Sequence, residues 1–69
     1  MTKFCVIASV FEGVKNLIPG VEMYICAEYS TKEKAMECLD MDILKERLCL
    51  IVEVETSKEA MDHILKLGN

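Results

Sequence analysis

Three stretches of the chain have the apolar composition and the alternation that predict β-strands. Residues 3–11 are rich in β-branched and aromatic side chains and contain no Gly or Pro. Both alternating sets of positions in this stretch are mainly apolar, so we expect it at the centre of a sheet, covered on both sides. Residues 21–29 and 47–55 have a similar composition and predict the second and third strands.

Two helices are predicted, each from a Ser/Thr-x-x-Glu signal that precedes apolar residues at helical spacing. The first signal is Ser-Thr-Lys-Glu at 30–33, with Ser30 as the expected cap. Its helix is expected to reach about Leu39, with an extension through Lys45 as the alternative, because no Gly or Pro stops it. The second signal is Thr-Ser-Lys-Glu at 56–59. The apolar stripe behind it is Ala60, Met61, Ile64 and Leu65.

The order of elements predicts an α+β fold of the type ββαβα, with residues 1–69 forming a single domain. The second strand returns beside the first, and the first helix then brings the chain back for the third strand. The resulting sheet is three-stranded and mainly antiparallel, with the strand order 2-1-3. Right-handed connection would place both helices on one face of this sheet.

A sheet covered on one face only would leave a large apolar face in contact with water. Hydrophobic residues make up 52% of the chain, above the roughly 45–50% that is usual for globular domains. Small monomers rarely expose large apolar patches. We therefore expect a homo-oligomer, such as a homodimer. The alternative is a monomer whose helices divide between the two faces.

The connection between the first two strands, residues 12–20, is unusually apolar for a loop and ends in a Pro-Gly turn signal. It is the leading candidate for an interface, and the sequence does not separate a self-interface from a site for another protein. Tyrosines in the second strand are further candidates, because tyrosine provides contact area with little loss of entropy. The predicted interface residues are Val14, Leu17, Ile18, Pro19, Tyr24 and Tyr29. The candidate ligand contacts are Lys15 and Arg47.

Charge and cysteine content exclude several classes of function. Eight Lys and Arg against twelve Asp and Glu give a net charge of −4, which argues against binding to nucleic acid phosphates. No apolar run has the length of a membrane span, and no secretory signal is found, so we expect a cytoplasmic protein. The four cysteines are expected to be reduced and buried. They form no close pair of the kind zinc sites use, and we expect no metal and no cofactor.

No catalytic motif is found in the chain. It contains one histidine, His63, and no phosphate-binding, dinucleotide-binding or zinc-protease signature. The leading hypothesis is a small non-catalytic protein that acts as a homo-oligomer and binds and modulates a partner protein. The alternative is a protein that binds or sequesters a small ligand or nucleotide in a pocket between subunits. A small enzyme is the third hypothesis.

The stretch from Ile25 to Ala35, Ile-Cys-Ala-Glu-Tyr-Ser-Thr-Lys-Glu-Lys-Ala, with Ile-Val-Glu-Val-Glu at 51–55, resembles a loose group of small uncharacterised phage and bacterial accessory proteins. In that group a hairpin ends in Tyr/Phe-Ser-x-x-Glu-Lys-Ala and is followed by a helix and an Ile-x-Glu-Val-Glu strand. The resemblance covers about half of the chain and includes neither the second helix nor the 12–20 loop. It implies an accessory protein, such as a phage-encoded antagonist of a host protein.

Overall fold

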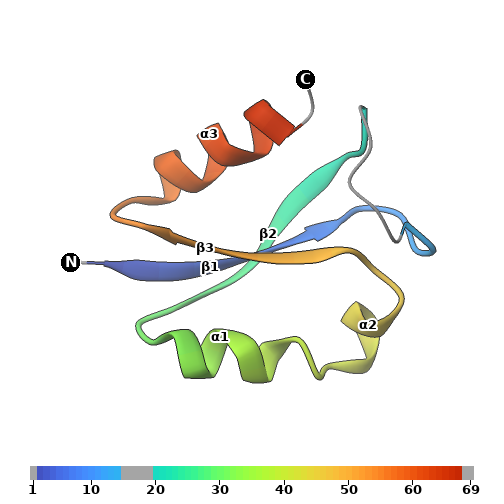
Figure 1. The fold of residues 1–69 in the computed structure, drawn as a ribbon, viewed down its shortest axis with the longest axis horizontal. Coiled ribbons are helices and arrows are strands. Elements are labelled where there is room, and N and C mark those ends of the chain that lie inside the picture. The colour runs from blue at the N-terminus through green and yellow to red at the C-terminus, as the bar shows by residue number, and fades with distance from the viewer. Residues whose placement is uncertain (1, 15–19, 68–69) are drawn as a thin grey trace.

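The fold is a three-stranded antiparallel sheet with a helical layer on each face, as Figure 1 shows. The structure, a computed structural model, describes residues 2–14 and 20–67. Its elements in chain order are β1 (Lys3–Ser9), β2 (Met23–Tyr29), α1 (Lys32–Cys38), α2 (Asp42–Lys45), β3 (Cys49–Val54) and α3 (Ser57–Leu67).

The strand order β2-β1-β3, with β1 antiparallel to both neighbours, confirms the predicted α+β fold and its topology. Cys5 of β1 lies opposite Glu28 of β2 and Val52 of β3. The pairing of β1 with β2 is interrupted once, where the partner shifts from Ala27 to Ile25 between consecutive residues of β1. Cys26 is therefore the extra residue of a β-bulge in β2.

β1 is buried on both faces, as its two apolar sets predict. Its residues Cys5 to Ala8 are all fully buried. Val6 and Ala8 belong to a core cluster with Ala35 of α1, whereas Cys5 belongs to a separate cluster with Ala60 of α3. The sheet thus divides the core into two parts, and each part is covered by its own helix.

The expectation that both helices lie on one face is wrong, because α1 and α3 cover opposite faces (Figure 1). The handedness rule applies to α1, which connects the parallel strands β2 and β3. It does not apply to α3, which follows the last strand and packs on the face that α1 leaves open. This arrangement removes the open sheet face on which the expectation of a homo-oligomer was based.

The first helix is capped one residue later than predicted. Thr31, not Ser30, is the N-cap residue, and its hydroxyl accepts a hydrogen bond from the Lys34 amide at 3.3 Å. The helix ends at Cys38 with Leu39 as its C-cap, close to the predicted end. The alternative of a continuous helix through Lys45 is wrong, because a turn separates α1 from the short α2.

The second predicted cap is confirmed at Thr56, whose hydroxyl accepts a hydrogen bond from the Glu59 amide at 3.3 Å. The Glu59 carboxylate accepts a hydrogen bond from the Glu55 amide at 3.0 Å, one residue before the expected donor. The bond to Thr56 satisfies an amide in the first turn of α3, where the helix itself supplies no acceptor. The bond from Glu55 satisfies an amide in the segment that leads into the helix.

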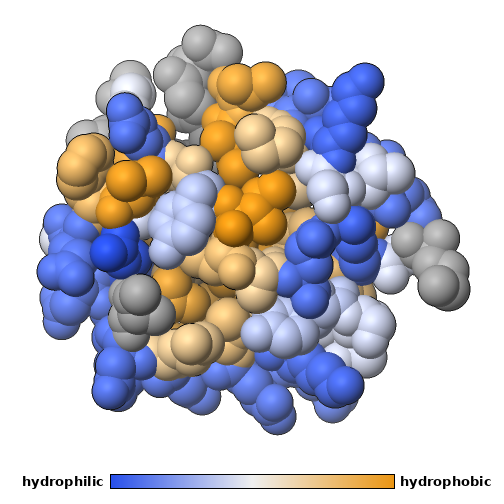
Figure 2. Space-filling model, turned by 180° about the vertical axis from the view of Figure 1, so that it is seen from behind, coloured by the Kyte–Doolittle hydropathy of each residue, from blue (hydrophilic) through white to orange (hydrophobic). Residues whose placement is uncertain are grey.

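The molecule is a slab whose shortest dimension runs across the strands. Its Cα extents are 32, 27 and 13 Å, and Figure 1 looks along the shortest axis. In that view β3 crosses in front of β2, so Figure 2, seen from behind, shows the broad side on which β2 lies. None of the helices within residues 2–14 and 20–67 has the length and apolar character required to cross a membrane.

Candidate functional site

The outer edge of β2 is the main feature that the two helical layers leave uncovered on the broad side seen in Figure 2. β2 pairs with β1 along one edge, and no strand in the described part of the chain pairs with its other edge. An edge of this kind presents backbone N–H and C=O groups that can pair with another strand. β2 contains no Pro or Lys, the residues that often block such pairing, and Glu28 is its one charged residue.

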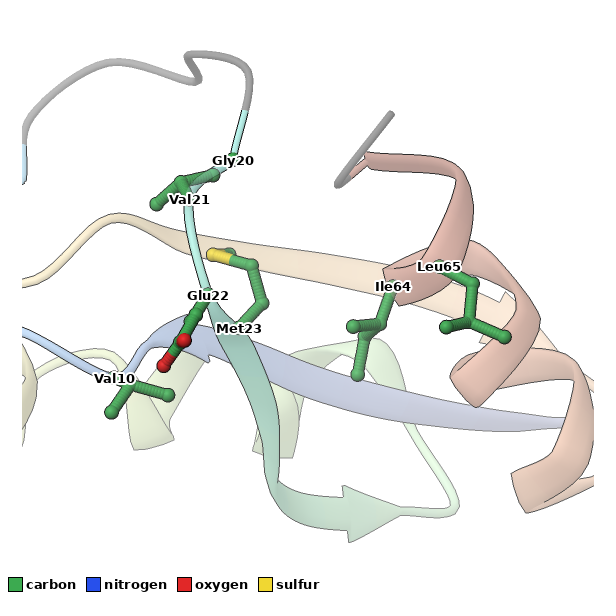
Figure 3. A pocket seen from close by; sticks show the side chains of 7 residues that line it. All are labelled: Val10, Gly20, Val21, Glu22, Met23, Ile64 and Leu65. Carbon is green, nitrogen blue, oxygen red and sulfur yellow. The ribbon is translucent and has the colours of Figure 1, made fainter.

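A hollow of about 460 Å³ lies beside the start of β2, between this strand and the last turns of α3 (Figure 3). We call it the α3-side hollow. Met23 of β2 and Ile64 of α3 stand on opposite sides of it in Figure 3. Its lining includes Val10, Val21, Glu22, Met23, Ile64 and Leu65.

A second hollow, of about 290 Å³, lies on the other face of β2, between this strand and the segment that contains α1 and α2. We call it the α1-side hollow. Its lining includes Tyr24, Cys26, Tyr29, Cys38, Met41 and Leu44. The Cys38 thiol contacts the Met41 sulfur at 3.8 Å. The pKa of Tyr24 is raised mainly by a hydrogen bond with the Cys26 thiol, and that of Tyr29 by one with the Cys38 thiol.

The two hollows and the edge between them form one continuous region, which we call the β2-side surface. Figure 2 shows an apolar band across the middle of this side with hydrophilic residues around it. An apolar patch with a polar rim is typical of surfaces that bind other proteins. The β2-side surface is therefore the candidate functional site.

A polar cluster closes the end of this surface, where β2 leads into α1. Lys3 forms an ion pair with Glu28 at 2.7 Å and donates a hydrogen bond to the Ser57 hydroxyl at 2.9 Å. Ser57 donates a hydrogen bond to the Glu28 carboxylate at 2.7 Å. These interactions lower the pKa of Glu28, and the hydrogen bond with Glu28 raises the pKa of Lys3. The one charge of β2 is thus compensated within the chain.

All four cysteines lie within the described residues and are free thiols, as predicted. The prediction that all four are buried is confirmed for Cys5 and Cys38 and is wrong for Cys26 and Cys49, which are half-buried. Burial raises the pKa of Cys5, which also contacts the Glu28 carboxylate at 3.6 Å. Burial likewise raises the pKa of Cys49. A raised pKa disfavours the thiolate, which is the reactive form of cysteine. The reactive thiolate form is therefore disfavoured at both Cys5 and Cys49.

Two of the predicted interface residues lie together in the structure, and others are not among the residues that it describes. Tyr24 and Tyr29 line the same α1-side hollow. Val14 is half-buried at the end of the described part of the loop. The interface candidates Leu17, Ile18 and Pro19 fall outside the described residues, as does the candidate ligand contact Lys15.

Arg47, a candidate ligand contact, has partners within the chain. Its guanidinium donates hydrogen bonds to the carbonyl oxygens of Ser9, at 2.9 Å, and Val10, and lies 3.8 Å from the Glu12 carboxylate. Its side chain is 14% exposed. Arg47 thus connects the end of β1 to the segment before β3.

Sequence reasoning missed the α3-side hollow and its residues Met23, Ile64 and Leu65. Ile64 and Leu65 belong to the predicted apolar stripe of the second helix, but periodicity does not show which part of a stripe stays uncovered. Leu65 is 63% exposed, whereas Ala60 in the same stripe is fully buried.

Within residues 2–14 and 20–67, no three His, Cys, Asp or Glu side chains are grouped so that they could hold a metal ion. No protein-family model matches the sequence, and comparison with curated proteins and with solved structures finds no match. The function proposed below is therefore based on the residues and geometry of this chain.

Proposed function

We propose that this protein is a small non-catalytic interaction protein that acts as a homo-oligomer in the cytoplasm. In that form it binds and modulates a partner protein, as an inhibitor or adaptor. The observation that supports this proposal is the β2-side surface, an uncovered strand edge with an apolar hollow on each of its two faces. That the chain is a phage-encoded antagonist of a host protein stays a prediction from the resemblance.

Each part of this surface has a property that favours contact with protein. The strand edge can add a further strand, which gives affinity through main-chain hydrogen bonds. The hollows can accept apolar side chains from either face of that strand. Tyr24 and Tyr29 add aromatic area of the kind that dominates the energy of protein interfaces.

The alternative, a binder of a small ligand or nucleotide, has less support. It requires cationic groups directed into a pocket. Arg47 is directed to main-chain carbonyl groups of the 9–10 segment, and Lys3 is paired with Glu28. Lys15 lies outside the described residues. The β2-side hollows are lined mainly by aliphatic, aromatic and sulfur-containing side chains, which suit protein contacts better than phosphate.

The first test is the molar mass in solution, measured by light scattering under reducing conditions across a dilution series. A dimer or larger assembly that dissociates on dilution supports the proposal. A monomer at every concentration contradicts the homo-oligomer. Binding to another protein is then tested with Leu65→Lys, which places a charge beside the α3-side hollow at an exposed position. Loss of binding in this variant but not in Met36→Lys, an exposed position outside both hollows, supports a partner site there.

A further inference from the structure

The β-bulge gives β2 an arrangement of side chains that is symmetric about its own midpoint. Cys26, Ala27 and Tyr29 pack on the α1 side of the sheet, and Tyr24 lines the α1-side hollow with Cys26. On the opposite face, Ile25 packs against the core cluster beneath α3.

Glu28 also faces the α3 side, where it contacts Cys5 and Ser57. The six side chains from Tyr24 to Tyr29 therefore lie, in order, on the α1, α3, α1, α1, α3 and α1 sides of the sheet. A regular strand alternates without interruption and cannot have this pattern. The extra residue of the bulge places Cys26 and Ala27 on the same face.

Such a pattern fits a second copy of itself. Two antiparallel strands related by a two-fold axis place each residue opposite one that faces the same side of the sheet. An axis between Cys26 and Ala27 meets this condition for all six residues from Tyr24 to Tyr29. It places Tyr24 of one copy opposite Tyr29 of the other, and Ile25 opposite Glu28. The two Glu28 side chains are not opposite each other, which avoids a repulsive pair.

We propose that two copies of this chain pair antiparallel through the outer edges of β2, with the two-fold axis between Cys26 and Ala27. The pairing forms a continuous six-stranded sheet and brings Tyr24 and Tyr29 of different copies into contact. This inference rests on the homo-oligomer of the proposed function and names its interface. A foreign strand can pair with this edge as well, because the regular strand β1 already pairs with the inner edge of the bulged β2. We favour a second copy because its face pattern matches at all six positions and keeps the two Glu28 side chains apart.

The available area is sufficient for such a dimer. A stable interface needs about 600 Å² from each partner at the low end of the usual range. That is roughly an eighth of the accessible surface of this chain, 4698 Å². The broad side on which β2 lies has Cα extents of 32 and 27 Å, and both hollows border the strand edge on that side.

The experiment measures dimer dissociation by sedimentation equilibrium for the wild type and two lysine variants. Tyr24→Lys puts a charge at a partly exposed edge position, and two such sites occur in each dimer. We expect the dissociation constant to rise about thirtyfold or more. Met36→Lys is the matched control, because Met36 is 53% exposed on α1 and lines neither hollow. It should leave the dissociation constant within about twofold of the wild type.

A second measurement locates the axis independently of the lysine variants. A short bis-maleimide, which joins two thiols without an oxidant, should link wild-type dimers through the two Cys26 thiols beside the axis. The link should be lost in Cys26→Ser and kept in Cys5→Ser, because Cys5 is fully buried.

The outcomes separate the two proposals. A wild type that is monomeric at every concentration overturns the homo-oligomer and this interface together. A dimer that tolerates Tyr24→Lys and gives no link through Cys26 overturns the β2 interface alone, and the homo-oligomer then uses another surface.

Discussion

Replacing Ile7 with Ala tests whether the face of β1 beneath α3 is a true core. Ile7 is fully buried and, by alternation, lies on the same face as Cys5, which packs with Ala60 of α3. The carbon atoms lost in Ile7→Ala account for about 2.4 kcal/mol of transfer free energy. The cavity left behind raises the expected loss to about 3–4 kcal/mol, within the range measured for such changes.

This loss is large for a chain of 69 residues. A stability of 0.05–0.15 kcal/mol per residue gives about 3–10 kcal/mol in total. Ile7→Ala is therefore expected to be close to unfolding, so Ile7→Val, with an expected loss of about 1 kcal/mol, serves as the milder companion. Met36→Ala, at an exposed position, should change the free energy of unfolding by less than about 0.5 kcal/mol.

The assay is urea unfolding followed by far-UV circular dichroism, with all variants at one protein concentration, because dimerisation would make the midpoint depend on concentration. The slope of free energy against urea should be the same for Ile7→Val and wild type, so that the shift in midpoint reports stability. If Ile7→Ala costs no more than Met36→Ala, α3 does not cover this face, and the reasoning about the two-sided core is refuted.

Three further predictions concern single contacts. Glu28→Gln should remove part of the pH dependence of stability. Because the pKa of Glu28 is lowered in the folded protein, the contribution of this carboxylate to stability is present above the ordinary value of 4.5 and is lost as pH falls through the lower folded value. The urea midpoints of wild type and variant should therefore converge in acid. Thr56→Ala should cost about 1 kcal/mol of unfolding free energy, and Thr56→Ser much less, because serine keeps the hydroxyl that caps α3. Equal losses in the two variants would show that the hydrogen bond to this hydroxyl is not the cause. Gly20→Ala should cost about 1 kcal/mol of unfolding free energy from backbone strain alone, since Gly20 has φ of +85° and an added Cβ meets no atom within 4 Å. Gly20→Asn should cost less in the same urea unfolding assay.

The strands and their order could be predicted because β1 has a distinctive pattern. Two apolar faces within one strand require a central position, and in a three-stranded sheet this leaves one neighbour on each side of β1. The caps were predictable to within one residue, because Ser30 and Thr31 are adjacent residues that can both cap a helix. Thr31 is the cap in the structure because its hydroxyl accepts a hydrogen bond from the Lys34 amide.

The face of the sheet on which α3 packs could not be predicted from the handedness of crossover connections. The crossover rule fixes α1 only, and α3 is directed by the need to cover Cys5 and its neighbours on the opposite face. The bulge in β2 was also missed, since no Gly or irregular composition marks Cys26. Without the bulge, Tyr24 and Tyr29 would lie on opposite faces by alternation, and the α1-side hollow would not contain both.

The packing of α3 also changes what kind of assembly this chain can form. An open sheet face would have to be buried permanently, and the dimer would then be obligate. With both faces covered inside one chain, the edge of β2 and its two hollows remain for self-association on that side. We expect an edge dimer of the proposed kind to bury an area near the lower end of the range for stable interfaces, and to be less permanent than a dimer joined through open sheet faces. The folded monomer should therefore exist at low concentration, and dilution should release the β2-side surface for a partner protein that competes with the second copy.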